Sequence, residues 1–104
     1  MGIQAFTKFG NTVTFTADTT APTPVQADSV GGNQYRIVNA GNVAVFIGSG
    51  ATSGEAVANA GNVVTSVPIL PTTQQVLTFL PNSYFTGKTS SGTAVCYVTP
   101  GDGL

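Results

Sequence analysis

The fold is decided by the stretch Gln34-Tyr35-Arg36-Ile37-Val38-Asn39-Ala40-Gly41-Asn42-Val43-Ala44-Val45-Phe46-Ile47-Gly48. Two runs rich in β-branched and aromatic residues flank the pair Gly41-Asn42, and residues of these kinds favour β-strands. A Gly-Asn pair between two strands predicts a tight turn, because such turns need positive φ angles that these two residues tolerate. We therefore expect a β-hairpin at the centre of the protein.

The expected hairpin carries apolar side chains on both faces. Because side chains alternate along a strand, one face receives Val38, Val45 and Ile47 and the other receives Tyr35, Ile37 and Phe46. A sheet in a two-layer protein contacts the core through one face only. The second apolar face therefore needs a cover, which is either a long loop of the same chain or the surface of a subunit or partner.

The rest of the chain alternates short strand-like runs with turns rich in Gly, Pro and Asn. Pro22 and Pro24 favour an extended path, so residues 17–32 are expected to form a long loop that could cover the hairpin. The spacing of the runs predicts an all-β protein with a single β-sandwich domain over residues 1–104. We expect about seven or eight short antiparallel strands with Greek-key or jelly-roll connections.

Two further turns are expected beside the central hairpin. Gly10-Asn11 predicts a hairpin between Ile3–Phe9 and Thr12–Thr16, with Val13 and Phe15 on one face. The pentapeptide Asn-Ala-Gly-Asn-Val occurs at residues 39–43 and again at 59–63, and its second copy is interpreted as another hairpin turn. Residues Glu55–Ala60 before that copy fit one helical turn or a short strand, and we expect a loop or turn there.

Charged residues make up only 7% of the chain, against about 25% in an average domain. So little charge leaves a large neutral surface, which suits a protein packed against neighbours. A secreted module with a neutral Thr, Asn and Ser surface is the alternative. The three cations, Lys8, Arg36 and Lys88, cannot build a phosphate-binding groove, so no nucleic-acid partner is expected.

Export and membrane signals are not expected either. The N-terminal residues 1–6 do not combine a basic region with an apolar core, as a Sec signal would. No apolar run approaches the roughly 20 residues that span a membrane, so no membrane partner is expected.

The chain carries little of the usual inventory of chemistry. It contains no histidine, the commonest general base and metal ligand. Cys96 lies in a strand-like run and is expected to be a small buried hydrophobe rather than a nucleophile. The four carboxylates are far apart in sequence, and tryptophan is absent, which argues against a glycosidase pair. We therefore expect no enzyme, no catalytic residue, no cofactor and no metal.

Three segments of the chain resemble a known family. They are Thr93–Tyr97 with the tail Val98–Leu104, Tyr35–Asn39, and Val45–Gly48. Together they resemble the small all-β head decoration proteins, also called cement proteins, of tailed bacteriophages. The resemblance implies a structural virion protein that is made in the host cytoplasm and binds the outer surface of the capsid. It further implies a homo-oligomer, often a homotrimer, that stabilises contacts between subunits of the major capsid protein, with no catalytic residues.

The two-sided strands give a hypothesis for the interface of such an oligomer. Tyr35, Ile37 and Phe46 would lie between protomers. Pro22 and Pro24, in the long loop, would reach the shell. Oligomerisation would then convert weak contacts into stable attachment by raising the effective concentration.

The alternative function is a carbohydrate- or receptor-binding β-sandwich module of a phage spike or tail. In that case exposed tyrosines such as Tyr84 or Tyr97 would stack on sugars beside Asn and Thr side chains. A concave site with exposed aromatic rings would favour this alternative, whereas a flat apolar face would favour decoration. A head–tail adaptor or tail-tube subunit is a closer relative of the decoration hypothesis.

Overall fold

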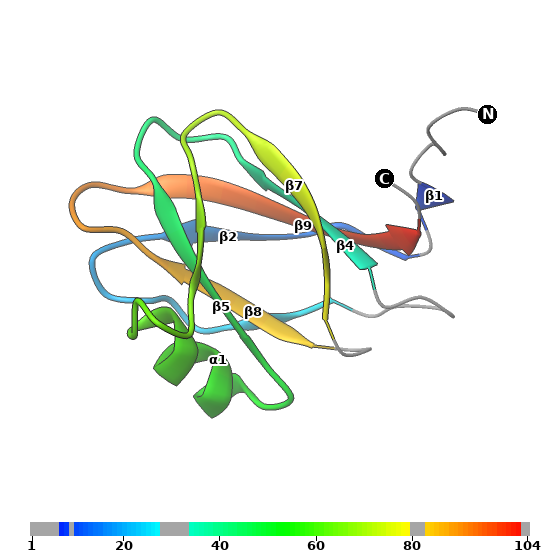
Figure 1. The fold of residues 1–104 in the computed structure, drawn as a ribbon, viewed down its shortest axis with the longest axis horizontal. Helices are drawn as coiled ribbons and strands as arrows, with labels where there is room; N and C mark the ends of the chain where they lie inside the picture. The colour runs from blue at the N-terminus through cyan, green and yellow to red at the C-terminus, as the bar shows by residue number, and fades with distance from the viewer. Residues whose placement is uncertain (1–6, 9, 28–33, 80–82, 103–104) are drawn as a thin grey trace.

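The computed structural model describes residues 7–8, 10–27, 34–79 and 83–102. These residues form nine strands and one helix: β1 (Thr7–Lys8), β2 (Val13–Ala17), β3 (Val25–Gln26), β4 (Gln34–Asn39), β5 (Val45–Gly50), α1 (Ser53–Ala60), β6 (Val67–Ile69), β7 (Gln74–Thr78), β8 (Tyr84–Lys88) and β9 (Ala94–Asp102). The strands build two antiparallel sheets that pack as a sandwich (Figure 1). The expected all-β sandwich is confirmed.

The order of the strands is that of a jelly roll. Sheet A has the order β1-β9-β4-β7, with β2 also paired to β9, and sheet B has the order β3-β8-β5-β6. β1 and β2 count here as one interrupted strand, so the chain has eight strands. These strands pair in nested order from the ends of the chain inward: β2 with β9, β3 with β8, β4 with β7, and β5 with β6. This nested pairing folds the chain back along itself across two sheets. Of the two connection types expected, the structure shows the jelly roll.

The expected central hairpin is wrong, because β4 lies in sheet A and β5 lies in sheet B. The chain crosses between the sheets at residues 40–44, next to the fully buried side chain of Asn39. The Nδ2 atom of Asn39 donates to the backbone oxygens of Val43 and Ile69 at 2.9 and 3.1 Å. Its Oδ1 atom accepts from the backbone nitrogen of Gly41 at 3.0 Å. One buried amide thus holds the crossing as an arch between the sheets.

The crossing resolves the two-sided apolar pattern of these strands. Tyr35 and Ile37 of β4 and Val45 and Ile47 of β5 all point into the space between the sheets, and none is more than 1% exposed. Residues assigned to opposite faces of one ribbon therefore share a single core. The other buried members of that core are Phe15, Ala17, Ala27, Ile69, Phe85, Ala94, Cys96 and Val98.

The expected first hairpin is also wrong, because β1 and β2 run in the same direction along β9. The register shifts by two residues between them, and Pro100 of β9 lies opposite the interruption. Because proline has no N–H to donate, a break in the neighbouring edge strand fits this position. Phe15 is buried and Val13 is half-buried, so the predicted inward face of β2 is confirmed. Residues 3–6 and 9 of the expected first strand lie outside the described residues.

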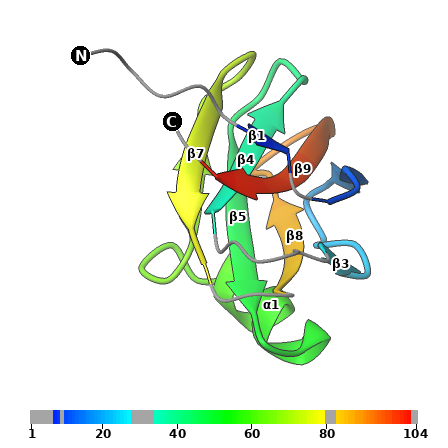
Figure 2. The same ribbon diagram turned by 90° about the vertical axis from the view of Figure 1, so that its right-hand side faces the viewer.

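Residues Ser53–Ala60 form helix α1, where a loop or turn and the start of a hairpin turn were expected. Thr52 is the N-cap: its Oγ1 atom accepts from the backbone nitrogen of Glu55 at 3.2 Å and contacts the Glu55 carboxylate at 3.5 Å. The residues have the Thr-x-x-Glu spacing of a capping box, and the threonine oxygen satisfies one helix donor that would otherwise lack a partner. The helix lies against the outer side of β5 and β8 (Figures 1 and 2).

Helix α1 approaches sheet B closely because β5 presents glycines to it. A Cβ atom at Gly48 would overlap the backbone of Ala56 and Ala60, and one at Gly50 would lie 2.5 Å from the Cβ of Glu55. Ala56 and Ala60 are themselves buried. Residues 48–50 are therefore the end of a strand, and the missing side chains of Gly48 and Gly50 let the helix backbone pack directly on the sheet.

Candidate functional site

The structure separates the five residues predicted to form an interface. Tyr35 and Ile37 are 0% exposed, so the prediction that they lie between protomers is wrong. The Tyr35 ring packs edge-to-face against Phe85, with 5.0 Å between the ring centroids. The error follows from the hairpin hypothesis, which placed these side chains on an outer face.

Phe46, Pro22 and Pro24 are half-buried and lie in two other places. Phe46 points outward from β5 and lines a small pocket of about 180 Å³ beside the end of helix α1. Pro22 and Pro24 precede β3, the edge strand of sheet B. The backbone oxygen of Pro22 accepts a hydrogen bond from Thr86 Oγ1 at 2.9 Å. The five residues therefore do not form one surface.

A different surface, the outer face of sheet A, is a better candidate. Helix α1 covers the outer side of sheet B, whereas no element in the described part of the chain covers sheet A. We call its outward side chains the open face: Lys8, Thr14, Thr16, Gln34, Arg36, Val38, Gln74, Val76, Thr78, Val95, Tyr97 and Thr99. Val95 and Tyr97, on the central strand β9, are 38% and 41% exposed.

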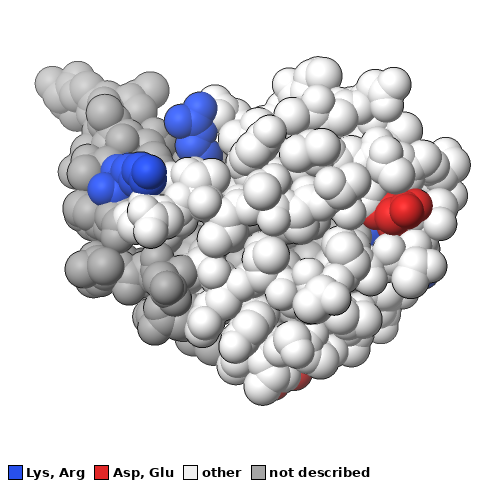
Figure 3. Space-filling model, turned by 180° about the vertical axis from the view of Figure 1, so that it is seen from behind, with Lys and Arg blue, Asp and Glu red and all other residues white. Residues whose placement is uncertain are grey.

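The open face is neutral over most of its area. Tyr97 stands between Thr14 on β2 and Val38 on β4. Its charged members are Lys8, which is exposed on β1, and Arg36, which donates from Nε to the Gln74 side-chain oxygen at 2.6 Å. The side of the molecule seen in Figure 3 also carries few charged side chains among its described residues. A face of hydroxyl, methyl and aromatic groups can exclude water against another neutral surface.

The exposed valines of the helix side form a second apolar surface. Val57 of α1 and Val63 and Val64, which follow it, are 41%, 72% and 85% exposed. We call these three residues the valine patch. The patch belongs to the side of the molecule where α1 covers sheet B, since Val63 also lines the small pocket with Phe46.

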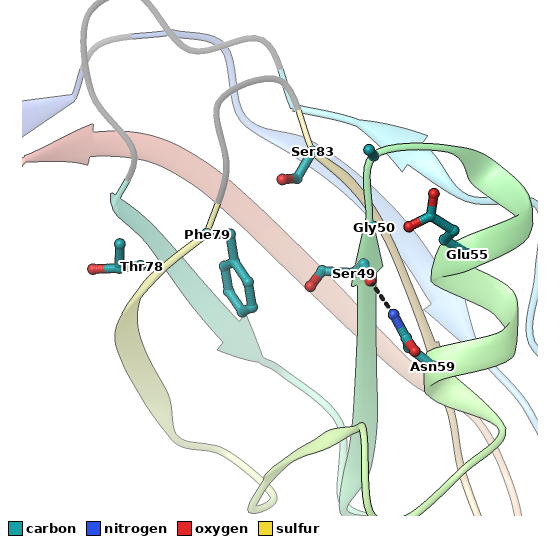
Figure 4. Close-up of a pocket in the computed structure, with 8 residues that line it drawn as sticks. Ser49, Gly50, Glu55, Asn59, Thr78, Phe79 and Ser83 are labelled. Carbon is teal, nitrogen blue, oxygen red and sulfur yellow. Dashed lines mark hydrogen bonds between the residues drawn. The ribbon is translucent and has the colours of Figure 1, made fainter.

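A pocket of about 450 Å³ lies where α1 meets the ends of β5 and β7 (Figure 4). Its side chains come from four segments: Ser49, Glu55, Asn59, Thr78, Phe79 and Ser83. The Nδ2 atom of Asn59 donates to the backbone oxygen of Ser49 at 2.7 Å. The pocket combines one aromatic ring with hydroxyl, amide and carboxylate groups, which suits a polar uncharged ligand.

The remaining candidates for chemistry are the Cys96 thiol and any cluster of metal-binding side chains. Burial raises the pKa of the Cys96 thiol to about 11, so the thiol is neutral at physiological pH. Among the described residues, no three His, Cys, Asp or Glu side chains come together to hold a metal ion. The described part of the chain also holds no helix of the length and apolar character that membrane crossing requires.

Sequence reasoning missed both the open face and the pocket. The alternation of Thr14 and Thr16 with Phe15, and of Val95 and Tyr97 with Cys96, was a visible signal for the open face. The pocket had no comparable signal, because its residues come from positions spread over 49–83. No protein-family model, curated protein or solved structure that we compared with the chain matches it.

Proposed function

We propose that the protein is a structural virion protein that decorates the outer surface of a tailed-phage head as a homo-oligomer. The observation that carries the proposal is the open face of sheet A, which is uncovered and largely neutral. Exposed faces with a substantial apolar content mark sites of association in proteins of this size. The jelly-roll topology adds support by analogy, since it recurs in viral capsid domains as well as in lectins.

The open face is the surface that we assign to contacts between protomers. A stable protein–protein interface buries about 800 Å² on each partner, which calls for a broad surface such as the outer side of a sheet. Tyr97 is at the centre of this face, between Thr14 and Val38. Tyrosine is one of the residues that most often dominate the energy of an interface.

The valine patch is the surface that we assign to the major capsid protein. It is small, but its side chains protrude, with Val64 the most exposed large apolar residue in the described part of the chain. A small contact is weak alone, and an oligomer strengthens it because each bound subunit raises the effective concentration of the others. In this proposal the oligomer, with three subunits as the expected number, clamps neighbouring capsid subunits.

Light scattering and head binding test these two assignments with a matched pair of variants. We expect the wild-type mass to be a multiple of the 10.5 kDa chain, with three as the proposed factor, and the protein to cosediment with undecorated heads of the parent phage. Tyr97→Asp should yield monomers and weaken head binding. Val64→Asp places the same charge on the other surface, so it should keep the oligomeric mass and weaken only head binding.

Circular dichroism on both variants establishes that they remain folded before their masses are compared. A wild-type protein that stays monomeric at every concentration would refute the homo-oligomer. Wild-type protein that fails to cosediment with heads would refute the decoration role. An oligomer that survives in Tyr97→Asp would remove the open face from the interface.

A further inference from the structure

The pocket between α1 and the ends of β5 and β7 has the size of a small-ligand site. Its volume of about 450 Å³ falls within the range of roughly 300–1,000 Å³ that such sites occupy. The wall on one side is helix α1, which contributes Glu55 and Asn59 one turn apart. Phe79 and Thr78 lie on the other side, with Ser49 between the two walls (Figure 4).

The ring of Phe79 is a fixed apolar surface within this pocket. It packs edge-to-face against Phe85 with 5.2 Å between centroids, and against Tyr35 with 6.0 Å. These contacts leave Phe79 half-buried, so part of its ring remains available to a ligand. A preorganised ring loses little conformational entropy when a ligand packs on it.

The polar groups around the ring are ready to bind hydroxyl groups. Asn59 uses Nδ2 to bind Ser49, which fixes the amide and leaves its Oδ1 as an acceptor. Ser49 Oγ has no hydrogen-bond partner among the described residues, whereas the Thr78 side chain points away from the ring of Phe79 (Figure 4). Hydroxyls both donate and accept, and the Glu55 carboxylate accepts. The set can therefore bind a ligand that carries several hydroxyl groups.

The charge of the pocket selects among such ligands. The described lining contains no Lys or Arg, while Glu55 contributes a negative charge. An anionic ligand would be repelled, since like charges in contact are unfavourable. A cationic ligand would be attracted to Glu55, but the described lining offers it one carboxylate and one aromatic ring, that of Phe79, beside several hydroxyl and amide groups that suit an uncharged ligand. A neutral polyhydroxylated ligand is the remaining fit.

We propose that this pocket binds one neutral hexopyranose unit of a glycan. The apolar C–H face of the sugar packs on the Phe79 ring, and its hydroxyls bind Ser49, Asn59 and Glu55. This site goes beyond the decoration role and does not depend on it, because its residues lie outside both the Tyr97 centre of the open face and the valine patch.

Nuclear magnetic resonance titration of the full chain tests the site with defined probes. The neutral probes are the methyl glycosides of glucose, galactose, mannose and N-acetylglucosamine, and the charged probe is glucuronate. At least one neutral glycoside should give saturable shifts at the amides of Ser49, Glu55, Asn59 and Phe79. Glucuronate should bind about tenfold more weakly or not at all, as expected when a carboxylate meets Glu55.

Three variants separate a ligand role from a structural role. Ser49→Ala removes the hydroxyl that points toward Phe79 and should weaken sugar binding about fivefold to tenfold. Ser91→Ala makes the same change at an exposed position in the turn before β9 and should leave binding unchanged. Glu55→Gln keeps the capping box, because Gln also serves at that position, and should reduce the discrimination against glucuronate.

Three results would overturn the proposal. The first is an absence of saturable shifts with all four neutral glycosides. The second is saturable binding whose shifts lie away from the pocket. The third is an equal effect of Ser49→Ala and Ser91→Ala on the affinity. Oligomeric mass and head binding are measured separately, so failure of this site and failure of the decoration role are distinguishable.

Discussion

Replacing Gly48 with alanine should loosen helix α1 from sheet B. The added Cβ atom would lie 2.6 Å from the Cβ of Ala60 and would also overlap backbone atoms of Ala56 and Ala60. Cβ atoms in proteins essentially never approach neighbours closer than 3.0 Å, so the strand or the helix has to move. Overpacking of a close contact typically costs about 1–3 kcal/mol. We expect Gly48→Ala to lower the free energy of unfolding by that amount.

Gly54→Ala is the matched control for this substitution. Gly54 lies in the first turn of α1, and a Cβ atom there would meet no atom within 4 Å. In a helix, alanine is more favourable than glycine by roughly 0.5–1 kcal/mol. The same chemical change should therefore destabilise the protein at position 48 and stabilise it at position 54.

Thermal unfolding followed by circular dichroism measures both variants. For a domain of this size, 1 kcal/mol shifts the melting temperature by about 4–8 °C. Gly48→Ala should thus lower the melting temperature by at least about 4 °C, and Gly54→Ala should raise it by a few degrees. An unchanged melting temperature for Gly48→Ala would refute the argument that glycine at this position is required for the helix to dock.

Two further predictions concern buried polar groups. Asn39→Ala removes three hydrogen bonds from the arch between the sheets and should cost about 2–4 kcal/mol, measured by urea unfolding. The exposed cap Asn62→Ala, which loses one bond to the Val64 nitrogen, should cost less than about 1 kcal/mol, and equal costs would contradict the structural role of Asn39. Burial raises the pKa of Cys96 from 9.0 to about 11, so between these pH values the folded state holds a proton that the unfolded state releases. The free energy of unfolding should therefore fall as pH rises through that window. In Cys96→Ala, measured by unfolding at a series of pH values, the fall that this thiol causes should be absent. A fall of the same size in both proteins would contradict the burial of the thiol.

The fold class was predictable because strand spacing and turn residues are local features. The pairing of strands was not, as the central stretch shows. Gly41-Asn42 between two apolar runs is compatible with a hairpin and with an arch. The arch is stabilised when the amide of Asn39 binds the backbone of Ile69, 30 residues away. No pattern within the central stretch records that contact, so the face assignments of Tyr35 and Ile37 failed with the hairpin.

Helix α1 illustrates a signal that was present in the sequence and was missed. Thr52 and Glu55 have the spacing of a capping box, which predicts a helix start. The repeated pentapeptide at 59–63 was interpreted as a hairpin turn instead. The reason for the glycines of β5 became clear only from the packing of the helix on Gly48, since a sequence does not show which element will cover a strand.

The contrast between the two outer faces constrains how the proposed assembly forms. On sheet B, the outward side of β5 consists of Phe46 and two glycines, which offer no polar groups to water, and helix α1 packs over it. Sheet A instead presents threonines around Tyr97 and Val95, whose exposed fractions of 41% and 38% are moderate. Such a face can be hydrated in the free chain, and its burial in a complex is favourable because apolar surface is removed from water. We therefore expect protomers to associate reversibly through the open face, with oligomers that dissociate on dilution and become stable when many sites on a head hold them together.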